Sequence, residues 1–271
     1  MLPRDQEHST MAIDWTGTVA VITGGGSGIG RACAHSFARR GARVVVTDVD
    51  AGRAETVASE IGERAVGLRV DVTSQSDLEA ARDLALDRFG GVHLVMNNVG
   101  VIVMGGVEEI PLEAWQRAID VNLLGIVRSN LVFLPHLLAQ GSGYVVNTAS
   151  TLGLIPYAYD RTPYMATKHA VVGLSEGMWL ALGPRGVQVS CLCPAGVMTN
   201  IVEQITVYGT TAPPRPPTLP VAEAAEVGET VAEGVTAGRF LILTAPEVAD
   251  EVAAHGADMD GYLARMAADL A

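Results

Sequence analysis

The feature that most constrains the fold of this 271-residue sequence is a regular alternation of short apolar runs with longer amphipathic segments. The apolar runs are rich in β-branched residues and lack polar alternation, so they predict strands buried on both faces. Strands of this kind, separated by helices, predict an α/β fold with a doubly wound parallel sheet. We expect seven strands, at residues 18–23, 43–48, 65–70, 92–97, 143–149, 187–193 and 240–243.

The segments between these strands have the spacing of helices that cover both faces of the sheet. Pro135 lies inside the longest of them and predicts a kink or a local break. Residues 210–220 contain a cluster of prolines and predict a stiff loop that interrupts the alternation. We expect helices at residues 28–40, 52–61, 75–89, 112–139, 163–182 and 221–237.

The composition excludes several classes of protein. With 18 basic and 30 acidic residues, the net charge of −12 argues against nucleic acid or an anionic membrane as a partner. No apolar run reaches the ~18 residues of a membrane span, and the N-terminal residues do not resemble a secretory signal. The three cysteines fit a reducing cytoplasm, and the histidines and acids form no cluster with metal-ligand spacing. We therefore expect a cytoplasmic protein without a metal site.

The first predicted strand runs into the glycine-rich stretch TGGGSGIG, at residues 23–30. Gly24, Gly28 and Gly30 allow a tight turn and a close approach of the backbone to a pyrophosphate. The helix that follows offers free N–H groups and the positive end of its dipole to the phosphates. Because the stretch lies between a strand and a helix, we expect a dinucleotide there rather than a plain strand–helix turn.

The second predicted strand ends in Asp48, eighteen residues after Gly30. A carboxylate at this position can accept both hydroxyls of an adenosine ribose, and it repels a 2′-phosphate. No basic residue stands at positions 47 or 49, and position 27 is Ser, so NAD is favoured over NADP. The alternative is a solvated turn acid. Asp71 and Val72 end the third strand and are placed to meet the adenine, although Asp71 could equally be an ordinary turn residue.

Tyr164 and Lys168 are spaced i and i+4 on a predicted helix and therefore share one face. A tyrosine hydroxyl titrates near ~10, which makes it a poor acid or base at neutral pH. A cation beside it, together with a positively charged nicotinamide, lowers that pKa. Lys168 is the only lysine in a chain that otherwise uses arginine, so a chemical role is favoured over a surface Tyr–Lys pair.

At these positions the sequence resembles the short-chain dehydrogenase/reductase family, over about residues 16–199. The resemblance rests on seven motifs in the family's order: TGGGSGIG, Asp71–Val72, NNVG at 97–100, Asn122 in VNLLG, NTASTLG around Ser150, YMATK at 164–168, and PAGVMT at 194–199. It implies a Rossmann fold with a seven-stranded sheet, which matches the seven predicted strands. It also implies reversible hydride transfer between NAD(H) and a secondary alcohol or ketone.

The resemblance also implies a role for each matched residue. Tyr164 is then the general acid/base, and Lys168 holds the nicotinamide ribose and lowers the pKa of Tyr164. Ser150 hydrogen-bonds the substrate oxygen, and the backbone of Asn122 anchors a water of the proton relay. The cofactor contacts that it implies are Gly24, Ser27, Gly28, Ile29, Gly30, Asp48, Asp71, Val72, Asn98, Gly100, Tyr164, Lys168, Pro194, Val197 and Thr199.

Ser150 and Tyr164 are fourteen residues apart, one more than is usual in the family. Gly153 assigns Ser150 as the catalytic hydroxyl, with Thr151 as the alternative. The extra residue then lies in the loop LIPYAYDRTP, beside the substrate.

We expect a polar N-terminal tail at residues 1–14 and a single domain at 15–271, with a substrate lid at 200–220 and an acidic helical tail at 244–271. The acidic C-terminal tail is the largest departure from the family. Because the lid is rich in proline and nearly uncharged, it favours an apolar or cyclic alcohol. The family also implies a homo-oligomer, a dimer or tetramer, built on helices 112–139 and 163–182. The alternative function is a catalytically silent NAD-binding or scaffold protein on the same fold.

Overall fold

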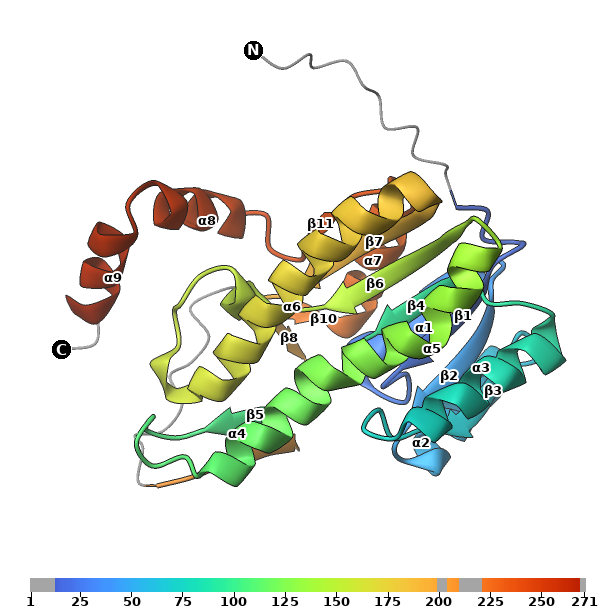
Figure 1. The fold of residues 1–271 in the computed structure, drawn as a ribbon, viewed down its shortest axis with the longest axis horizontal. Helices are drawn as coiled ribbons and strands as arrows, with labels where there is room; N and C mark the ends of the chain where they lie inside the picture. Colours follow the sequence, from blue (N-terminus) through green and yellow to red (C-terminus); the bar gives the residue numbers. More distant parts are fainter. Residues whose placement is uncertain (1–12, 199–203, 210–220, 269–271) are drawn as a thin grey trace, which may run out of the picture.

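A seven-stranded parallel sheet forms the centre of the computed structural model, which describes residues 13–198, 204–209 and 221–268. Its strand order is β11-β7-β6-β4-β1-β2-β3, which is that of a doubly wound sheet (Figure 1). All seven predicted strands are present, with ends shifted by at most two residues. They are β1 (Val19–Thr23), β2 (Arg43–Asp48), β3 (Ala65–Arg69), β4 (Leu94–Asn97), β6 (Gly143–Thr148), β7 (Val187–Cys193) and β11 (Leu241–Leu243).

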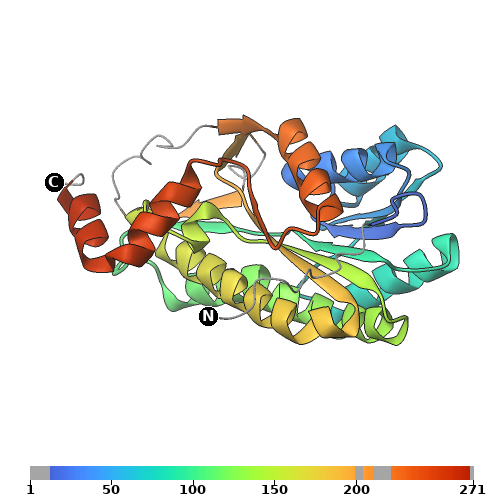
Figure 2. The same cartoon turned by 90° about the horizontal axis from the view of Figure 1, so that it is seen from above.

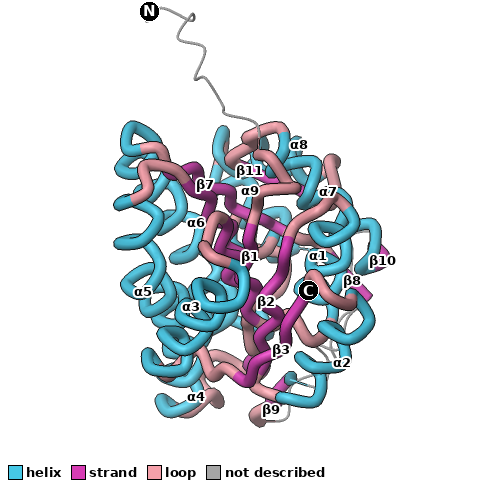
Figure 3. The backbone as a smooth tube through the Cα atoms, turned by 90° about the vertical axis from the view of Figure 1, so that its right-hand side faces the viewer, coloured by secondary structure: helices cyan, strands magenta, loops and turns pink. Residues whose placement is uncertain are grey.

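Helices cover both faces of this sheet, and the alternation of side chains along each strand decides which residues they meet (Figure 3). Ala20 and Ile22 of β1 pack against α1 (Gly28–Arg39), α2 (Ala51–Ile61) and α7 (Ala224–Thr236). Val19 and Val21, on the other face, pack with the opposite helical layer. That layer consists of α3 (Gln75–Phe89), α4 (Leu112–Ile119), α5 (Gly125–Ala139) and α6 (Thr162–Leu182). Three short 3₁₀ turns, at Thr151–Gly153, Tyr159–Arg161 and Gly183–Arg185, flank α6.

The long helix predicted at residues 112–139 is interrupted, but at a different place from the one predicted. A π-helical turn, Asp120–Leu124, separates α4 from α5, whereas α5 continues through Pro135. The predicted break at Pro135 is therefore wrong. Pro135 lies on the exposed side of α5, where water can satisfy the carbonyl group that its missing N–H leaves free.

This same stretch, Leu112–Ala139, has the length and apolar composition of a membrane span, contrary to the expectation that no segment would qualify. Val132, Phe133 and Leu137 of α5 are nevertheless buried in the core beneath the sheet. They pack there with residues of α3 and α6. Burial of this kind is typical of the core helix of a globular domain.

Four three-residue strands pair outside the central sheet, and they were not predicted. β5 (Ile102–Met104) pairs with β9 (Ile205–Val207), and β8 (Gly196–Met198) pairs with β10 (Val221–Glu223). The helix predicted from residue 221 consequently begins at Ala224. Strands this short are formed by pairing with a distant segment, so local sequence patterns do not reveal them.

The chain beyond β11 forms two helices, α8 (Val248–Ala257) and α9 (Met259–Ala268). They project from one end of the molecule, beyond the sheet and beside the start of α6 (Figure 2). The predicted N-terminal tail lies outside the described residues except for Ile13 and Asp14. Of the predicted lid, the structure describes only residues 204–209.

Candidate active site

A cleft of about 1610 Å³ opens at the carboxyl ends of the parallel strands, where ligands of doubly wound sheets bind. Gly30 and Asn122 stand behind its wall, and Thr199 lies outside the described residues. The other predicted site residues line it together: Gly24, Ser27, Gly28, Ile29, Asp48, Asp71, Val72, Asn98, Gly100, Ser150, Tyr164, Lys168, Pro194 and Val197.

The glycine-rich turn between β1 and α1 needs glycine at three positions for two different reasons. Gly24 and Gly28 have φ values of +64° and +50°, which side chains rarely adopt. A Cβ on Gly30 would lie 2.2 Å from the carbonyl oxygen of Gly24, so this glycine lets α1 pack against the turn. The first turn of α1 contains no acidic residue, which leaves its N-terminal N–H groups available to an anion.

Asp48 ends β2 at the rim of the cleft, and backbone N–H groups hold its carboxylate in place. One carboxylate oxygen accepts from the N–H of Gly26 at 3.1 Å, and the other accepts from the N–H of Asp50 at 3.1 Å. A Cβ on Gly26 would lie 2.8 Å from the Asp48 carboxylate, so this close approach requires glycine. The carboxylate is therefore a fixed acceptor at the end of β2.

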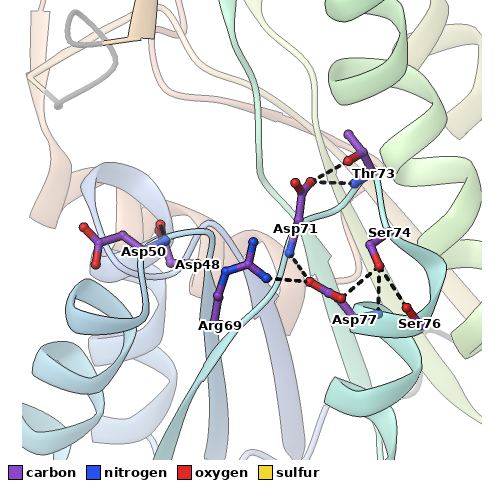
Figure 4. A network of polar contacts seen from close by, with 8 residues as sticks. All are labelled: Asp48, Asp50, Arg69, Asp71, Thr73, Ser74, Ser76 and Asp77. Atoms are coloured by element: carbon purple, nitrogen blue, oxygen red, sulfur yellow. Dashed lines mark hydrogen bonds and ion pairs between the residues drawn. The ribbon is translucent and has the colours of Figure 1, made fainter.

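Asp71 follows the neighbouring strand β3 and belongs to a network of polar contacts (Figure 4). One of its carboxylate oxygens accepts from the N–H and from the hydroxyl of Thr73, at 2.9 and 2.7 Å. Its own N–H donates to Asp77, which also receives a hydrogen bond from Arg69 at 3.1 Å. The N–H of Asp71 contributes most to holding the pKa of Asp77 below its usual value.

Asn98 ties together the ends of three central strands beside the glycine-rich turn. Its backbone N–H donates to the hydroxyl of Thr23 at 3.0 Å, and its side-chain amide donates to the carbonyl of Gly24 at 3.3 Å. Its amide oxygen accepts from the hydroxyl of Thr148 at 3.3 Å. Asn98 therefore supports the turn that would carry the pyrophosphate.

Ser150, Tyr164 and Lys168 meet in the interior of the cleft, where β6 ends and α6 begins. The Ser150 hydroxyl hydrogen-bonds that of Tyr164 and also accepts from the N–H of Leu152 at 3.2 Å. The Lys168 ammonium donates to the carbonyl of Thr148 at 2.7 Å and lies 5.4 Å from the centre of the Tyr164 ring. All three side chains are buried.

Burial controls the titration of this group. Desolvation raises the pKa of Tyr164 to about 12, and the hydrogen bond from Ser150 offsets only part of that effect. Desolvation also lowers the pKa of Lys168 to about 8. The expectation that Lys168, together with a bound nicotinamide, lowers the pKa of Tyr164 stays a prediction. The ammonium lies over the ring and is bound to the Thr148 carbonyl, so desolvation of the phenol dominates.

The alternative catalytic hydroxyl, Thr151, is turned away from Tyr164. Its hydroxyl shares a hydrogen bond of 2.7 Å with the hydroxyl of Tyr157, and its N–H donates to the carbonyl of Pro194 at 2.9 Å. Thr151 is completely buried and does not line the cleft. The geometry therefore favours Ser150.

Asn122 lies in the π-helical turn and joins two segments behind Lys168. Its side-chain oxygen accepts from the N–H of Val101 at 2.8 Å, and its amide donates to the Val101 carbonyl at 3.0 Å and to Thr167 at 3.1 Å. A Cβ on Gly100 would lie 3.3 Å from the Lys168 ammonium and 3.6 Å from the Asn122 side chain. The π turn thus holds the strand-end loop close to the lysine, as such turns often do at functional sites.

Helices α8 and α9 provide one wall of the cleft that was not predicted from the sequence. The apolar spacing within residues 259–268 indicates a packed helix face, but it does not say what that face packs against. The residues concerned are Glu251, Tyr262, Leu263, Met266 and Ala267.

Comparison with known proteins agrees with this geometry. The sequence model described as short chain dehydrogenase matches residues 18–207. Cyclohexanol dehydrogenase of Acinetobacter sp. (strain SE19) is 35% identical over 198 residues, which cover 72% of this chain and 78% of that protein. The 3-alpha-(or 20-beta)-hydroxysteroid dehydrogenase of Mycobacterium tuberculosis (strain ATCC 25618 / H37Rv) is 34% identical over 189 residues, covering 70% and 72%.

Among solved structures, a short chain dehydrogenase/reductase from Burkholderia phymatum in complex with NAD superposes with a TM-score of 0.81. It is 33% identical in sequence, and the match covers 92% of this chain and 96% of that one. With the matched motifs lining one cleft of a seven-stranded sheet, the chain belongs to the short-chain dehydrogenase/reductase family, and it is an oxidoreductase acting on CH–OH groups.

Proposed function

We propose that this protein is an NAD(H)-dependent dehydrogenase that interconverts a secondary alcohol and its ketone, with an apolar, cyclic substrate. The observation that carries the proposal is the hydrogen-bonded pair Ser150–Tyr164 beside buried Lys168, inside a cleft that also contains the glycine-rich turn. A silent scaffold would have no use for two linked hydroxyls and an ammonium enclosed beside a dinucleotide cradle.

The residues present fit a nicotinamide dinucleotide. The turn at Gly24 and Gly28 presents bare backbone and the N-terminus of α1 to a pyrophosphate. The fixed carboxylate of Asp48 is a ribose-hydroxyl acceptor and supports NAD over NADP. The cleft is also lined by the residues proposed to contact the adenosine part of NAD, which are Asp71, Val72, Asn98 and Gly100. Those proposed to contact the nicotinamide, Pro194 and Val197, line it as well. Bound NAD would supply the hydride acceptor and a positive ring charge.

The protein's own part in the reaction is the handling of one proton at the substrate oxygen. Tyr164 takes the hydroxyl proton during alcohol oxidation and returns it during ketone reduction. Ser150 hydrogen-bonds the same oxygen and orients it. Lys168, with a pKa of about 8, can exchange a proton near neutral pH and binds the nicotinamide ribose, while the backbone of Asn122 carries the relay outward. The positive ring charge of bound NAD would favour the phenolate of Tyr164, whose pKa burial alone holds high.

The substrate class rests on the lining of the cleft and on the relatives. Ile102, Leu152, Tyr157 and Ile205 give the reactive end an apolar surface. The names of two relatives state that those proteins oxidise a cyclic alcohol, cyclohexanol in one case and a hydroxysteroid in the other. We extend this substrate class to the present chain.

A panel of cyclic, aromatic and sugar alcohols, followed by NADH absorbance, tests the proposal with Tyr164→Phe as the matched variant. We expect cyclic alcohols to be the best substrates, and the variant to lose about 10²–10⁴-fold in kcat while it still binds NAD. Retained activity in the variant would refute the role of Tyr164. NAD binding by the wild type without turnover of any alcohol or ketone would instead support the silent scaffold.

We further propose a cytoplasmic homo-oligomer that binds neither nucleic acid nor membrane. The three cysteines, Cys33, Cys191 and Cys193, are buried free thiols, which supports a reducing compartment. Exposed leucines on α4, α5 and α6 support assembly through this helical face.

A further inference from the structure

The C-terminal helix α9 is attached to the reactive end of the cleft by a buried tyrosine. Tyr262 is only 2% exposed, and it packs in a small core with Ile155 and Val248. Tyr157 and Met266 are partly buried against the same core. Residues of α9 therefore contact the loop that connects Ser150 with Tyr164.

Polar and aromatic contacts define how α9 sits on α8. The hydroxyl of Tyr262 donates to Glu251 of α8, and the guanidinium of Arg265 lies 5.5 Å from the centre of the Tyr262 ring. The ring of His255, on α8, meets that of Tyr262 edge-on at 5.1 Å. At the start of α9, Asp258 accepts from the N–H of Gly261 at 2.9 Å. The two helices thus form a defined hairpin.

Two departures from the family pattern meet at this hairpin. The loop after Ser150 carries the extra residue, and it is the loop whose Ile155 and Tyr157 pack against α9. Tyr157 also hydrogen-bonds Thr151, the neighbour of Ser150, at 2.7 Å. A continuous set of contacts therefore leads from the reactive serine to the C-terminal helix, which lies outside the matched family segment 18–207.

One row of α9 lines the cleft. Leu263 and Ala267 are spaced i and i+4 and line the cleft beside Tyr262 and Met266. Leu263 is 44% exposed, so a large apolar side chain faces the space where a substrate would extend. Met259, on the same helix, is 56% exposed but does not line the cleft. The cleft wall formed by α9 is thus apolar at Leu263, Met266 and Ala267, and a mainly apolar lining is typical of pockets that bind small molecules.

We propose that α9 is the outer wall of the substrate pocket, and that Leu263 and Met266 are specificity-determining residues for a multi-ring apolar alcohol. The reactive carbon of the substrate lies at Ser150 and Tyr164, and the far rings lie against α9. This inference rests on the proposed function, since it assigns the substrate class of the same site. On this proposal, a one-ring alcohol bound at the catalytic hydroxyls does not contact Leu263 and Met266, whereas a multi-ring alcohol does.

The test compares Leu263→Ala and Met266→Ala with the control Met259→Ala, using cyclohexanol and a hydroxysteroid as substrates. Leu263 is exposed, so its truncation leaves the fold intact, and thermal melting checks this for each variant. We expect kcat/KM for the hydroxysteroid to fall about 10-fold in both wall variants, mainly through KM. For cyclohexanol, we expect kcat/KM in all three variants to stay within about twofold of the wild-type value. For Met259→Ala, we expect the same of kcat/KM for the hydroxysteroid.

Equilibrium dialysis of the corresponding ketosteroid with the wild type and Leu263→Ala tests the same wall without turnover. A weaker affinity in the variant supports the proposal, and equal affinities overturn it. Equal losses for cyclohexanol and the hydroxysteroid, or no loss for either, also overturn it. If the wild type turns over no alcohol or ketone of the panel, the proposed function fails, and the dialysis result still decides whether α9 binds multi-ring apolar ligands.

Discussion

At the scale of single residues, burial gives the reactive group properties that composition alone does not reveal. Desolvation shifts the pKa values of Tyr164 and Lys168 in opposite directions, because it disfavours both a phenolate and an ammonium. The resulting pKa values, about 12 for Tyr164 and about 8 for Lys168, differ from those of the unfolded chain, so they also make the stability of the fold depend on pH.

The pKa of Lys168 predicts a rise of stability with pH. Its folded value of about 8 lies below the ordinary 10.5, so between these values the unfolded chain binds more protons and the folded state gains stability as pH rises. Tyr164 works in the opposite sense, but only above its ordinary value of 10. We expect the free energy of unfolding of the wild type, relative to Lys168→Met, to increase by about 2 kcal/mol from pH 8 to 10. Urea unfolding at both pH values measures it, and a flat difference contradicts it.

Asp48 carries a prediction about cofactor choice. Replacing it by Ala removes a charged acceptor of the ribose hydroxyls, so we expect NAD to bind about 10- to 100-fold more weakly and the preference over NADP to relax. Calorimetric titration with NAD and with NADP gives the ratio of the two dissociation constants. Asp50→Ala is the matched control, because Asp50 caps the N–H of Arg53 at the start of α2. An unchanged ratio in the Asp48 variant would show that this carboxylate does not contact the ribose.

At the scale of elements, the π-helical turn between α4 and α5 positions the site more than any regular helix does. It brings the side chain of Asn122 to both backbone groups of Val101, where it accepts from the N–H at 2.8 Å and donates to the carbonyl at 3.0 Å. The same turn sets Gly100 against Lys168.

Asn122→Ala would leave the partly buried N–H and carbonyl of Val101 without their side-chain partner. We expect the free energy of unfolding to fall by about 2–3 kcal/mol, measured by urea denaturation. Asn130→Ala, on α5, is the control, since its amide donates only to the sulfur of Met178 at 3.3 Å and its loss should stay below ~1 kcal/mol. Equal effects of the two substitutions would mean that Asn122 is not a structural link.

At the scale of the whole molecule, the two layers of helices differ in what they leave exposed. Leu112, Leu131 and Leu180, on α4, α5 and α6, are all about two-thirds exposed, and these helices form one layer (Figure 3). Apolar side chains spread over one helical layer favour association with a second copy.

We expect sedimentation velocity to show a dimer or tetramer of the 28.3 kDa chain, and Leu131→Asp to shift it to a smaller species. The physical reason is the cost of burying a carboxylate without a partner in an apolar interface. Val107→Asp, in an exposed loop, serves as the control and should leave the mass unchanged. A monomeric wild type contradicts the expected assembly.

Local patterns in the sequence predicted the central sheet, and the family motifs identified many of the residues that line the cleft. Runs of β-branched residues indicate buried strands. The carboxyl ends of parallel strands meet at one edge of the sheet, so the residues that follow these strands gather there. Ser150, Tyr164 and Lys168 come together for this reason, helped by the helical spacing of the last two.

The features that escaped prediction all depend on contacts between distant segments. The pairing of β5 with β9, the π turn braced by Val101 and the α9 wall each arise from neighbours far away in the chain. The periodicity of a segment indicates which secondary structure that segment prefers. Burial and packing between distant segments of the chain decide the electrostatics and the shape of the pocket. Local sequence thus sets the sheet and its reactive edge, and long-range packing sets the pocket that meets the substrate.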